Sequence, residues 1–364
     1  MIEEKIHSAE KVLFITHLAI GDFTYLSNYF RAFKSRYPNT EIHIWVDELR
    51  RTRSPKKWAN LKRYVLYDWL ERCDFVDRIY SETFSPKTLE ASITEAQAQE
   101  YPVVVSLATL RPHFYAKLAR KISLGGFIVG IKKRPKFFAW RQKQAYKLLD
   151  DFFPHFTYSD GAHHVTDMYS HWFEYLGVPP LHEEERFPVL EIPSEWRIYA
   201  DRKLIEWGVS KTSKKIVFIN PFAKTPKRSW PILSVIEIIR SMRESPDWKD
   251  AFFIVNSMPE RMDEVRKLID GEGLTDVIVF SADENFFQLP AILARCHLIV
   301  SVETAVMHLA NAVGVNVVAL MRQKNPEWVP INRSISRVVL TQRRAEWVKD
   351  ISPPRVLEAI FKHD

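Results

Sequence analysis

The turn LAIGDFTY, residues 18–25, is the first place where the sequence offers a group that could do chemistry, the carboxylate of Asp22. The turn follows the apolar run VLFIT (12–16), which predicts a strand, and it leads into a helical pattern. A carboxylate at the carboxyl end of a strand can serve as a general base. An acidic residue in the first turn of a helix also has a structural explanation, because it accepts hydrogen bonds from free N–H groups and interacts favourably with the helix dipole. Together these effects stabilise the helix by about 1 kcal/mol.

A second turn, FINPFAKTPKRSWP (218–231), gathers positive charge between a predicted strand and a helix that starts near Trp230. Its basic side chains are Lys224, Lys227 and Arg228. Such groups at a strand-to-helix turn are suited to holding phosphate oxygens. The alternative is a solvated basic loop, since surface lysines and arginines are common.

A third segment, LIVSVETAVMHLANAVG (298–314), joins a predicted strand to a helix through Glu303. Thr304 opens the helix, and His308 lies about one turn further on. The free N–H groups at its start belong to Thr304, Ala305 and Val306, and helix N-termini of this kind bind diphosphates. An ordinary cap at Thr304 and a partly buried histidine at position 308 would explain the same residues without a ligand.

Two series of alternating strands and helices must position these turns. In the first half, apolar or aromatic runs predict strands at 12–16, 41–46, 75–80, 103–107 and 127–131, and residues 22–36 predict a helix. In the second half, strands are predicted at 216–220, 252–257, 277–281, 298–302 and 316–320. Helices are predicted from Pro231, from Pro259, near Leu289, from Thr304 and over 354–362. Strands separated by helices indicate parallel sheets with right-handed crossovers.

The pattern breaks at VPPLHEEERFPVLEIPSEW (178–196), whose four prolines and acidic cluster are typical of an irregular connector. The expected division is therefore an N-terminal domain at 1–178, a connector at 179–212, a C-terminal domain at 213–345 and a final helical segment at 346–364. Two α/β domains in series would leave a cleft lined by the carboxyl ends of both sets of strands. We expect the site in that cleft.

Composition restricts the class of protein. With 364 residues, 46% hydrophobic and 13% aromatic, the chain is expected to be globular and to form two domains. Two cysteines, Cys73 and Cys296, without a metal-binding spacing, favour a reducing compartment, and the cytoplasm is the default. No run approaches the ~18 apolar residues of a membrane span, and the acidic first ten residues do not resemble a secretory leader.

The net charge of +7 is unevenly distributed. Between residues 132 and 147, KKRPKFFAWRQKQAYK holds seven lysines or arginines and no acid. This stretch is either a solvated helix face or a binding surface for an anionic partner.

The order and spacing of the three turns resemble the heptosyltransferase family, glycosyltransferase family 9. That family pairs a G-D turn, a basic K-x-W-P turn and a D-[ST]-G-x-x-H-L-A-x-A-x-G helix. This chain has G-D at 21–22, K-R-S-W-P at 227–231 and V-E-T-A-V-M-H-L-A-N-A-V-G at 302–314. The resemblance extends over most of the chain and includes VVVSLATLRPHFYAKLARKI (103–122), AHHVTDMY (162–169) and YLGV (175–178).

The resemblance implies an α/β protein of the GT-B fold, with two Rossmann-like domains facing each other across a cleft. The N-terminal domain would bind the acceptor and the C-terminal domain the nucleotide sugar, and the final helix would pack back toward the N-terminal domain. Carried over by position, Asp22 matches the general base. The residues that match donor-binding positions are Lys224, Thr225, Lys227, Arg228, Glu303, Thr304, Ala305, Val306 and His308, and those expected to bind the acceptor are Arg111, Lys132, Lys133 and Arg134.

Three positions depart from the family pattern. Glu303 replaces the usual aspartate that contacts sugar hydroxyls, and Ala305 replaces a glycine, so a methylene and a methyl group crowd the expected donor site. Either the donor sugar is displaced, or it differs from heptose. Arg228 replaces a lysine at the phosphate-contacting position, which keeps the charge and changes the geometry of donation, and Lys227 is the alternative contact.

The function that the resemblance implies is inverting transfer of a heptose from ADP-heptose to the Kdo/heptose inner core of lipopolysaccharide or lipooligosaccharide. The expected partners are the nucleotide sugar and an anionic glycolipid, Kdo-lipid A or the core, at the cytoplasmic face of the bacterial inner membrane, with no nucleic acid. The anionic groups of this glycolipid would bind the basic stretch at residues 132–147. No cofactor and no metal are expected, and the absence of a DxD sequence near a predicted strand end agrees with metal independence.

Three alternatives stay open at this level. The chain could use another nucleotide sugar, or act on an acceptor outside lipopolysaccharide. It could also bind a nucleotide sugar without catalysis, in which case its function would not depend on Asp22. A Rossmann oxidoreductase or methyltransferase is disfavoured, because such enzymes need a glycine-rich first turn and this chain has 10 glycines in 364 residues.

Overall fold

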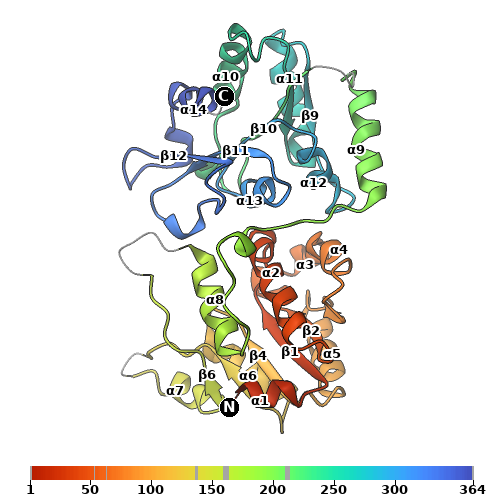
Figure 1. The fold of residues 1–364 in the computed structure, drawn as a ribbon, viewed down its shortest axis with the longest axis vertical. Coiled ribbons are helices and arrows are strands. Elements are labelled where there is room, and N and C mark those ends of the chain that lie inside the picture. The colour runs from red at the N-terminus through yellow and green to blue at the C-terminus, as the bar shows by residue number, and fades with distance from the viewer. Residues whose placement is uncertain are drawn as a thin grey trace. The chain divides into compact units, whose positions relative to one another are not determined.

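The computed structural model describes residues 2–52, 54–62, 64–135, 138–158, 164–209 and 214–362. The chain divides into two compact units, the first formed mainly by residues up to His182 and the second mainly by residues from Glu183 onward. Each unit contains a six-stranded parallel sheet flanked by helices (Figure 1). The predicted α/β class with two Rossmann-like domains is therefore confirmed.

The first unit has the sheet order β3-β2-β1-β4-β5-β6. Its strands are β1 (Lys11–Thr16), β2 (Glu41–Val46), β3 (Arg78–Tyr80), β4 (Val103–Ser106), β5 (Phe127–Gly130) and β6 (Asp151–Phe152). Its helices are α1 (Ile2–His7), α2 (Ile20–Arg36), α3 (Trp58–Leu61), α4 (Leu66–Leu70), α5 (Pro86–Gln97), α6 (Pro112–Ile122), α7 (Trp140–Tyr146) and α8 (Val165–Tyr175), with the short 3-10 turns η1 (Leu49–Arg51) and η2 (Pro55–Lys57). The strand order reverses between β1 and β4, and in such sheets ligands bind outside the carboxyl ends of the strands at this switch point.

Aromatic packing fixes two helices against the central strand of the first sheet. The ring of Phe14 on β1 lies 5.1 Å from Phe30 and 5.2 Å from Phe33 of α2, and it stacks on Phe173 of α8 at 6.3 Å. All four rings are buried. Because strand β1 is buried on both faces, α2 and α8 are held firmly at its side, and the residues at their ends acquire defined positions.

The second unit repeats the arrangement with the order β12-β11-β10-β7-β8-β9. Its strands are β7 (Ile216–Asn220), β8 (Phe252–Asn256), β9 (Val277–Phe280), β10 (Leu298–Val302), β11 (Asn316–Met321) and β12 (Ser336–Leu340). Its helices are α9 (Ser194–Glu206), α10 (Ile232–Glu244), α11 (Met262–Gly271), α12 (Gln288–Leu293), α13 (Ala305–Ala312) and α14 (Pro353–Phe361), with 3-10 turns η3 (Glu184–Arg186), η4 (Pro226–Arg228), η5 (Pro259–Arg261), η6 (Pro326–Trp328) and η7 (Val348–Asp350). Here the switch point lies between β7 and β10.

The core of the second unit explains where the final helix lies. Val356 and Ile360 of α14 are fully buried in the same cluster as Trp230 and the strand residue Val318. The indole Nε1 of Trp230 donates to the carbonyl of Ile351 at 2.8 Å. Helix α14 thus completes the core of its own unit, and the expected approach of this helix to the first domain stays a prediction.

The predicted strands and helices are recovered with small differences at their ends. Strand β3 begins only at Arg78, and helix α2 begins at Ile20, two residues before the predicted start. The sequence analysis missed the two-residue strand β6, the strand β12 and helix α9, which lies in the expected connector. Helix α9 gives a weak periodic signal because Ile198 and Ile205 are exposed and Ala200 is its one buried residue among those that the structure describes.

Neither cysteine forms a disulfide, since Cys73 and Cys296 are both free thiols. Among the helices in the described ranges, none is long and apolar enough to cross a membrane.

Candidate active site

Asp22 lies in the first turn of α2, at the carboxyl end of β1. The residue that caps the helix is Ala19, whose N–H donates to Oδ2 of Asp22 at 3.0 Å. The hydroxyl of Tyr169, on α8, donates to Oδ1 at 3.4 Å. Asp22 therefore does have the structural role that its position suggested, as a first-turn carboxylate that satisfies a free N–H group.

The electrostatic environment of Asp22 gives it a second property that capping does not require. Burial raises the pKa of its carboxyl, and the N–H group of Ala19, the charge of Arg50 and the hydroxyl of Tyr169 only partly offset this effect. A buried carboxylate with a raised pKa accepts a proton more readily than an exposed one, which is the property of a general base.

Positive charge surrounds this edge of the first sheet. His17 directly follows β1, and both of its ring nitrogens are buried without a hydrogen-bond partner among the described residues. Burial, and to a smaller extent the charges of Arg50, Arg111 and Arg51, together lower the pKa of His17 to about 3. The imidazole is therefore neutral at neutral pH and lies close to three arginines.

Two of these arginines come from the turn after β2, and the sequence analysis did not select them. The Nη2 of Arg51 donates to the carbonyl of Leu18 at 2.8 Å, and its guanidinium lies 3.9 Å from the ring of Tyr64. The hydroxyl of Tyr64 accepts from the N–H of Ile20 at 3.1 Å. Arg51 and Tyr64 thus connect the turn after β2 to the start of α2. The sequence signal that could have identified these arginines is their position, because the turns after β1 and β2 follow adjacent parallel strands.

The residues expected to bind the acceptor fall into two groups. Arg111 is exposed at the start of α6, with a φ of 52° that residues other than glycine rarely adopt, and its charge acts on His17. Lys132, Lys133 and Arg134 are exposed in the loop after β5, where Lys132 lies 4.3 Å from the ring of Phe152. Two further residues of the basic stretch, 136 and 137, lie outside the described residues.

In the second unit, a network of amides and hydroxyls occupies the switch point. Asn220, at the end of β7, donates to Ser301 at 3.0 Å and to the hydroxyl of Thr304 at 2.9 Å. Asn256, at the end of β8, donates to the side-chain oxygen of Asn220 at 2.9 Å. Thr304 is the cap of α13 and accepts from the N–H of Val306 at 3.4 Å. The network fixes the start of α13 at the carboxyl edge of the sheet.

Glu303, between β10 and α13, is almost completely buried, with 5% of its side chain exposed. Its Oε1 accepts from Asn325 at 2.8 Å and from Arg228 at 3.3 Å, and both oxygens accept from the guanidinium of Arg322. Burial alone would raise its pKa, but the hydrogen bonds from Arg322 and Asn325 and the charges of Arg228 and Arg322 outweigh burial and lower it. The carboxylate is therefore ionised and held by side chains from two turns, the one after β7 and the one after β11.

The basic turn contributes differently from residue to residue. Lys224 and Thr225 are exposed, and Arg228 is drawn inward to Glu303. Lys227 lies 5.5 Å from the ring of Trp347, which also has Arg322 at 5.1 Å and Lys324 at 5.8 Å. Arg322, Lys324, Asn325 and Trp347 belong to this cluster and were missed from the sequence, because they come from segments that carry none of the three motifs.

The first residue of helix α13 is partly exposed, and the residues after it are buried. Ala305 is partly exposed, whereas Val306 and His308 are buried. Burial lowers the pKa of His308 to about 3, and its ring lies 5.9 Å from that of Trp328. His308 is thus a neutral, buried side chain. Its predicted role toward the donor stays a prediction.

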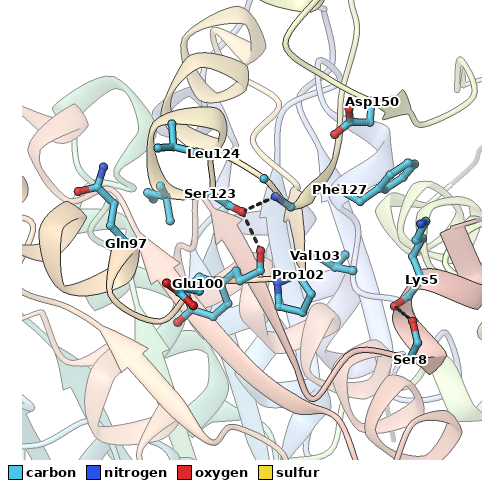
Figure 2. Close-up of a pocket in the computed structure, with 14 residues that line it drawn as sticks. Lys5, Ser8, Gln97, Glu100, Pro102, Val103, Ser123, Leu124, Phe127 and Asp150 are labelled. Atoms are coloured by element: carbon cyan, nitrogen blue, oxygen red, sulfur yellow. Dashed lines mark hydrogen bonds between the residues drawn. The ribbon is translucent and has the colours of Figure 1, made fainter.

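A cavity of about 720 Å³ lies in the first unit, at the amino ends of β4 and β5 (Figure 2). Its wall includes Ser123, whose hydroxyl donates to the carbonyl of Tyr101 at 2.7 Å and accepts from the N–H of Gly126 at 3.0 Å. These bonds close the turn between α6 and β5. The cavity is therefore at the end of the sheet opposite to Asp22.

Comparison with known proteins identifies the family and the fold. The model of glycosyltransferase family 9 (heptosyltransferase) matches residues 125–352. A search of curated proteins found no match. Among solved structures, the chain is similar to a family 9 glycosyl transferase from Veillonella parvula, with a TM-score of 0.76, 18% identity and 97% of each chain covered.

Two further solved structures are from E. coli. ADP-heptose lps heptosyltransferase II has a TM-score of 0.66 at 17% identity, over 97% of this chain and 98% of the other. Heptosyltransferase WaaC with ADP-2-deoxy-2-fluoro heptose has a TM-score of 0.62 at 14% identity, over 97% of this chain and 100% of the other. At these identities the structures establish a shared fold.

Proposed function

The chain belongs to glycosyltransferase family 9 (heptosyltransferase) and is a glycosyltransferase, and from this premise we propose that it transfers a heptose from ADP-heptose to the Kdo/heptose inner core of lipopolysaccharide or lipooligosaccharide. The observation that carries the proposal is the pair of sites at the two switch points. One holds a half-buried carboxylate with a raised pKa, and the other holds a capped helix start beside arginines.

Asp22 acts as the general base in this proposal. Its Oδ2 is engaged by the N–H of Ala19, and Oδ1, with the longer contact to Tyr169, takes the proton from the acceptor hydroxyl. The acceptor oxygen forms a bond to the anomeric carbon as the bond from that carbon to the β-phosphate oxygen breaks, with inversion of configuration. ADP departs with the electron pair of the broken bond.

The second unit stabilises the charge that develops on the departing diphosphate. The start of α13 supplies N–H groups and the positive end of a helix dipole. Arg228 and Lys227 supply positive charge from the neighbouring turn. The hydrogen bonds from Asn220 to Thr304 and from Asn256 to Asn220 support this role, because they hold the helix start in place before the ligand binds.

The acceptor is proposed to be anionic, as Kdo-lipid A or the lipopolysaccharide core is, and to meet the protein at the cytoplasmic membrane face. The arginines around His17 support an anionic acceptor, since Arg50 and Arg111 add positive charge at that edge, whereas Arg51 is paired with the buried Glu48. Lys132, Lys133 and Arg134 are exposed and would add attraction to an anionic lipid surface.

The experiment that tests the proposal measures nucleotide release from a panel of ADP-, GDP- and UDP-sugars, each with and without a Kdo-lipid acceptor. Release from ADP-heptose that depends on the acceptor is expected, and the Asp22→Asn variant serves as the matched inactive control. Acceptor-dependent release from another nucleotide sugar would contradict the donor assignment. If the protein binds a nucleotide sugar but releases no nucleotide under any condition, the proposal that it transfers heptose is contradicted.

A further inference from the structure

The hydrogen-bond capacity of Glu303 is already filled by the protein. A carboxylate has about four lone-pair sites. Oε1 accepts from Asn325, Arg228 and Arg322, and Oε2 accepts from Nε of Arg322 at 3.2 Å and from the backbone N–H of Arg322 at 3.5 Å. Sugar hydroxyls that donate to this carboxylate would have to displace these partners.

The groups that surround Glu303 are predominantly positive. Arg322 follows β11 directly, 12% of its side chain is exposed, and its guanidinium lies 5.1 Å from the ring of Trp347. The same ring has Lys227 and Lys324 within 6 Å. Arg228 and Arg322 contact the carboxylate, and Lys227 and Lys324 lie beside the same indole, so the cluster has four cations and one carboxylate.

One donor in the cluster is buried and unused. The Nε of Arg228 has no hydrogen-bond partner within the part of the chain that the structure describes. A buried N–H without an acceptor costs roughly 1–3 kcal/mol, so such a group is normally satisfied by a ligand or water. The Nε of Arg228 is therefore available to donate to an acceptor atom of a ligand.

We propose that Glu303 is a positioning residue that holds Arg228 and Arg322 together, and that Arg322 contacts an anionic group of the nucleotide-sugar donor. This inference rests on the proposed function, and it assigns the contact to guanidinium N–H groups in place of the Glu303 carboxylate. Two planar guanidinium groups fixed by one carboxylate form a rigid pair of donors, which suits phosphate or carboxylate oxygens. The anionic oxygens are those of the diphosphate, since the heptose of the proposed donor carries no acidic group.

Calorimetric titration of the full-length protein with ADP tests this contact. Arg322→Gln is expected to weaken ADP binding by roughly 10-fold to 100-fold, the range for loss of a charge-assisted hydrogen bond. Unchanged affinity for ADP overturns the proposal.

Two further variants control for loss of structure. Arg322→Lys retains the charge without the planar fork and should bind with intermediate affinity, which gives a measurement even if Arg322→Gln does not fold. Arg202→Ala removes an exposed arginine of α9 and should bind like the wild type. Thermal melting of each variant confirms that the protein compared is folded.

The positioning role of Glu303 is tested with Glu303→Gln. A residue that only positions the arginines changes ADP and ADP-heptose affinity by the same factor, because it never touches the sugar. A change confined to ADP-heptose would show that the carboxylate contacts the sugar and would overturn the proposal. A wild-type protein that binds neither ligand refutes the proposed function as well, whereas normal wild-type binding with no effect at Arg322 refutes only the inference.

Discussion

The guanidinium of Arg322 binds both oxygens of the buried Glu303 carboxylate, with Nε 3.2 Å from Oε2 and Nη2 3.4 Å from Oε1. This pairing explains why position 303 holds a glutamate and not the shorter aspartate. The carboxylate extends far enough to be shared among Arg322 and Asn325, from the turn after β11, and Arg228, from the turn after β7. An aspartate would retract the carboxylate by one methylene and lose part of that set.

Shortening Glu303 is therefore expected to harm the enzyme. Glu303→Asp should lower turnover with the true donor, because the arginines lose their common partner and a misplacement of about 1 Å can cost roughly 10²-fold. Steady-state kinetics with ADP-heptose and one other ADP- or GDP-sugar measure this. The double variant Glu303→Asp with Ala305→Gly tests the opposite view, that both departures are merely tolerated. A double variant faster than the wild type on ADP-heptose would refute our expectation.

Replacing Asp22 by asparagine should separate activity from stability. Asparagine can still accept the hydrogen bond from the N–H of Ala19, so the fold and donor binding are retained. Turnover should fall by about 10²–10⁴, the usual loss when a general base is removed. Parallel assays of turnover and ADP affinity on the same preparation check this, and full activity of the variant would remove Asp22 from the mechanism.

The melting temperature of the Asp22→Asn variant is expected to depend on pH differently from that of the wild type. Because burial raises the pKa of Asp22, the folded protein holds this proton more tightly than the unfolded chain. The corresponding stability is present below the unfolded pKa and is lost as pH rises through the folded pKa, so the ionised carboxylate destabilises the fold at neutral pH. Asp22→Asn should therefore unfold at a higher temperature than the wild type at pH 7, and this advantage should shrink on acidification. A lower melting temperature at pH 7 would contradict the sign.

Removal of Arg228 is expected to weaken binding of the donor phosphates. Arg228→Ala should reduce ADP affinity by more than Lys132→Ala or Lys133→Ala, because only Arg228 belongs to the cluster at Glu303 and a charge-assisted bond contributes roughly 1.5–3 kcal/mol. Calorimetric titration with ADP compares the three variants. Equal weakening in all three would mean that the turn at 224–228 does not hold the phosphates.

The buried His308 and the half-buried His17, whose ring nitrogens are buried, should make the protein sensitive to acid. Burial lowers the pKa of His17 and of His308 to about 3, so the folded protein resists protonation that the unfolded chain accepts. Their contribution to stability is complete above the unfolded pKa of 6.5 and is lost progressively as pH falls toward 3. The free energy of unfolding in urea, measured at several pH values from 7.5 to 5, should decrease, and His308→Gln should show a shallower decrease than the exposed-site variant His7→Gln. Identical slopes would exclude His308 as a source.

The sequence alone determined the architecture and the places where chemistry was to be sought. Short apolar strands, buried on both faces, give runs that are readable without tertiary information, and β1, β2, β7 and β10 were placed to within a residue. The motif turns follow such strands, so Asp22, Arg228 and Thr304 could be assigned to the carboxyl edges of the two sheets. Helix α9 was missed because its apolar residues are largely exposed and have no clear periodicity.

Only the tertiary structure decided which groups meet at those edges. Arg50 and Arg51 reach the surroundings of Asp22 because β2 lies beside β1, and Arg322 and Asn325 reach Glu303 because β11 lies beside β10. Strand order is set by long-range packing, so the spacing of residues along the sequence does not predict these partners. The same holds for protonation, since desolvation and neighbouring charges set the pKa values of Asp22, His17 and Glu303. Residue type and order therefore specify where each functional turn lies, whereas charge, partner and orientation follow from the neighbours that the parallel sheets bring together.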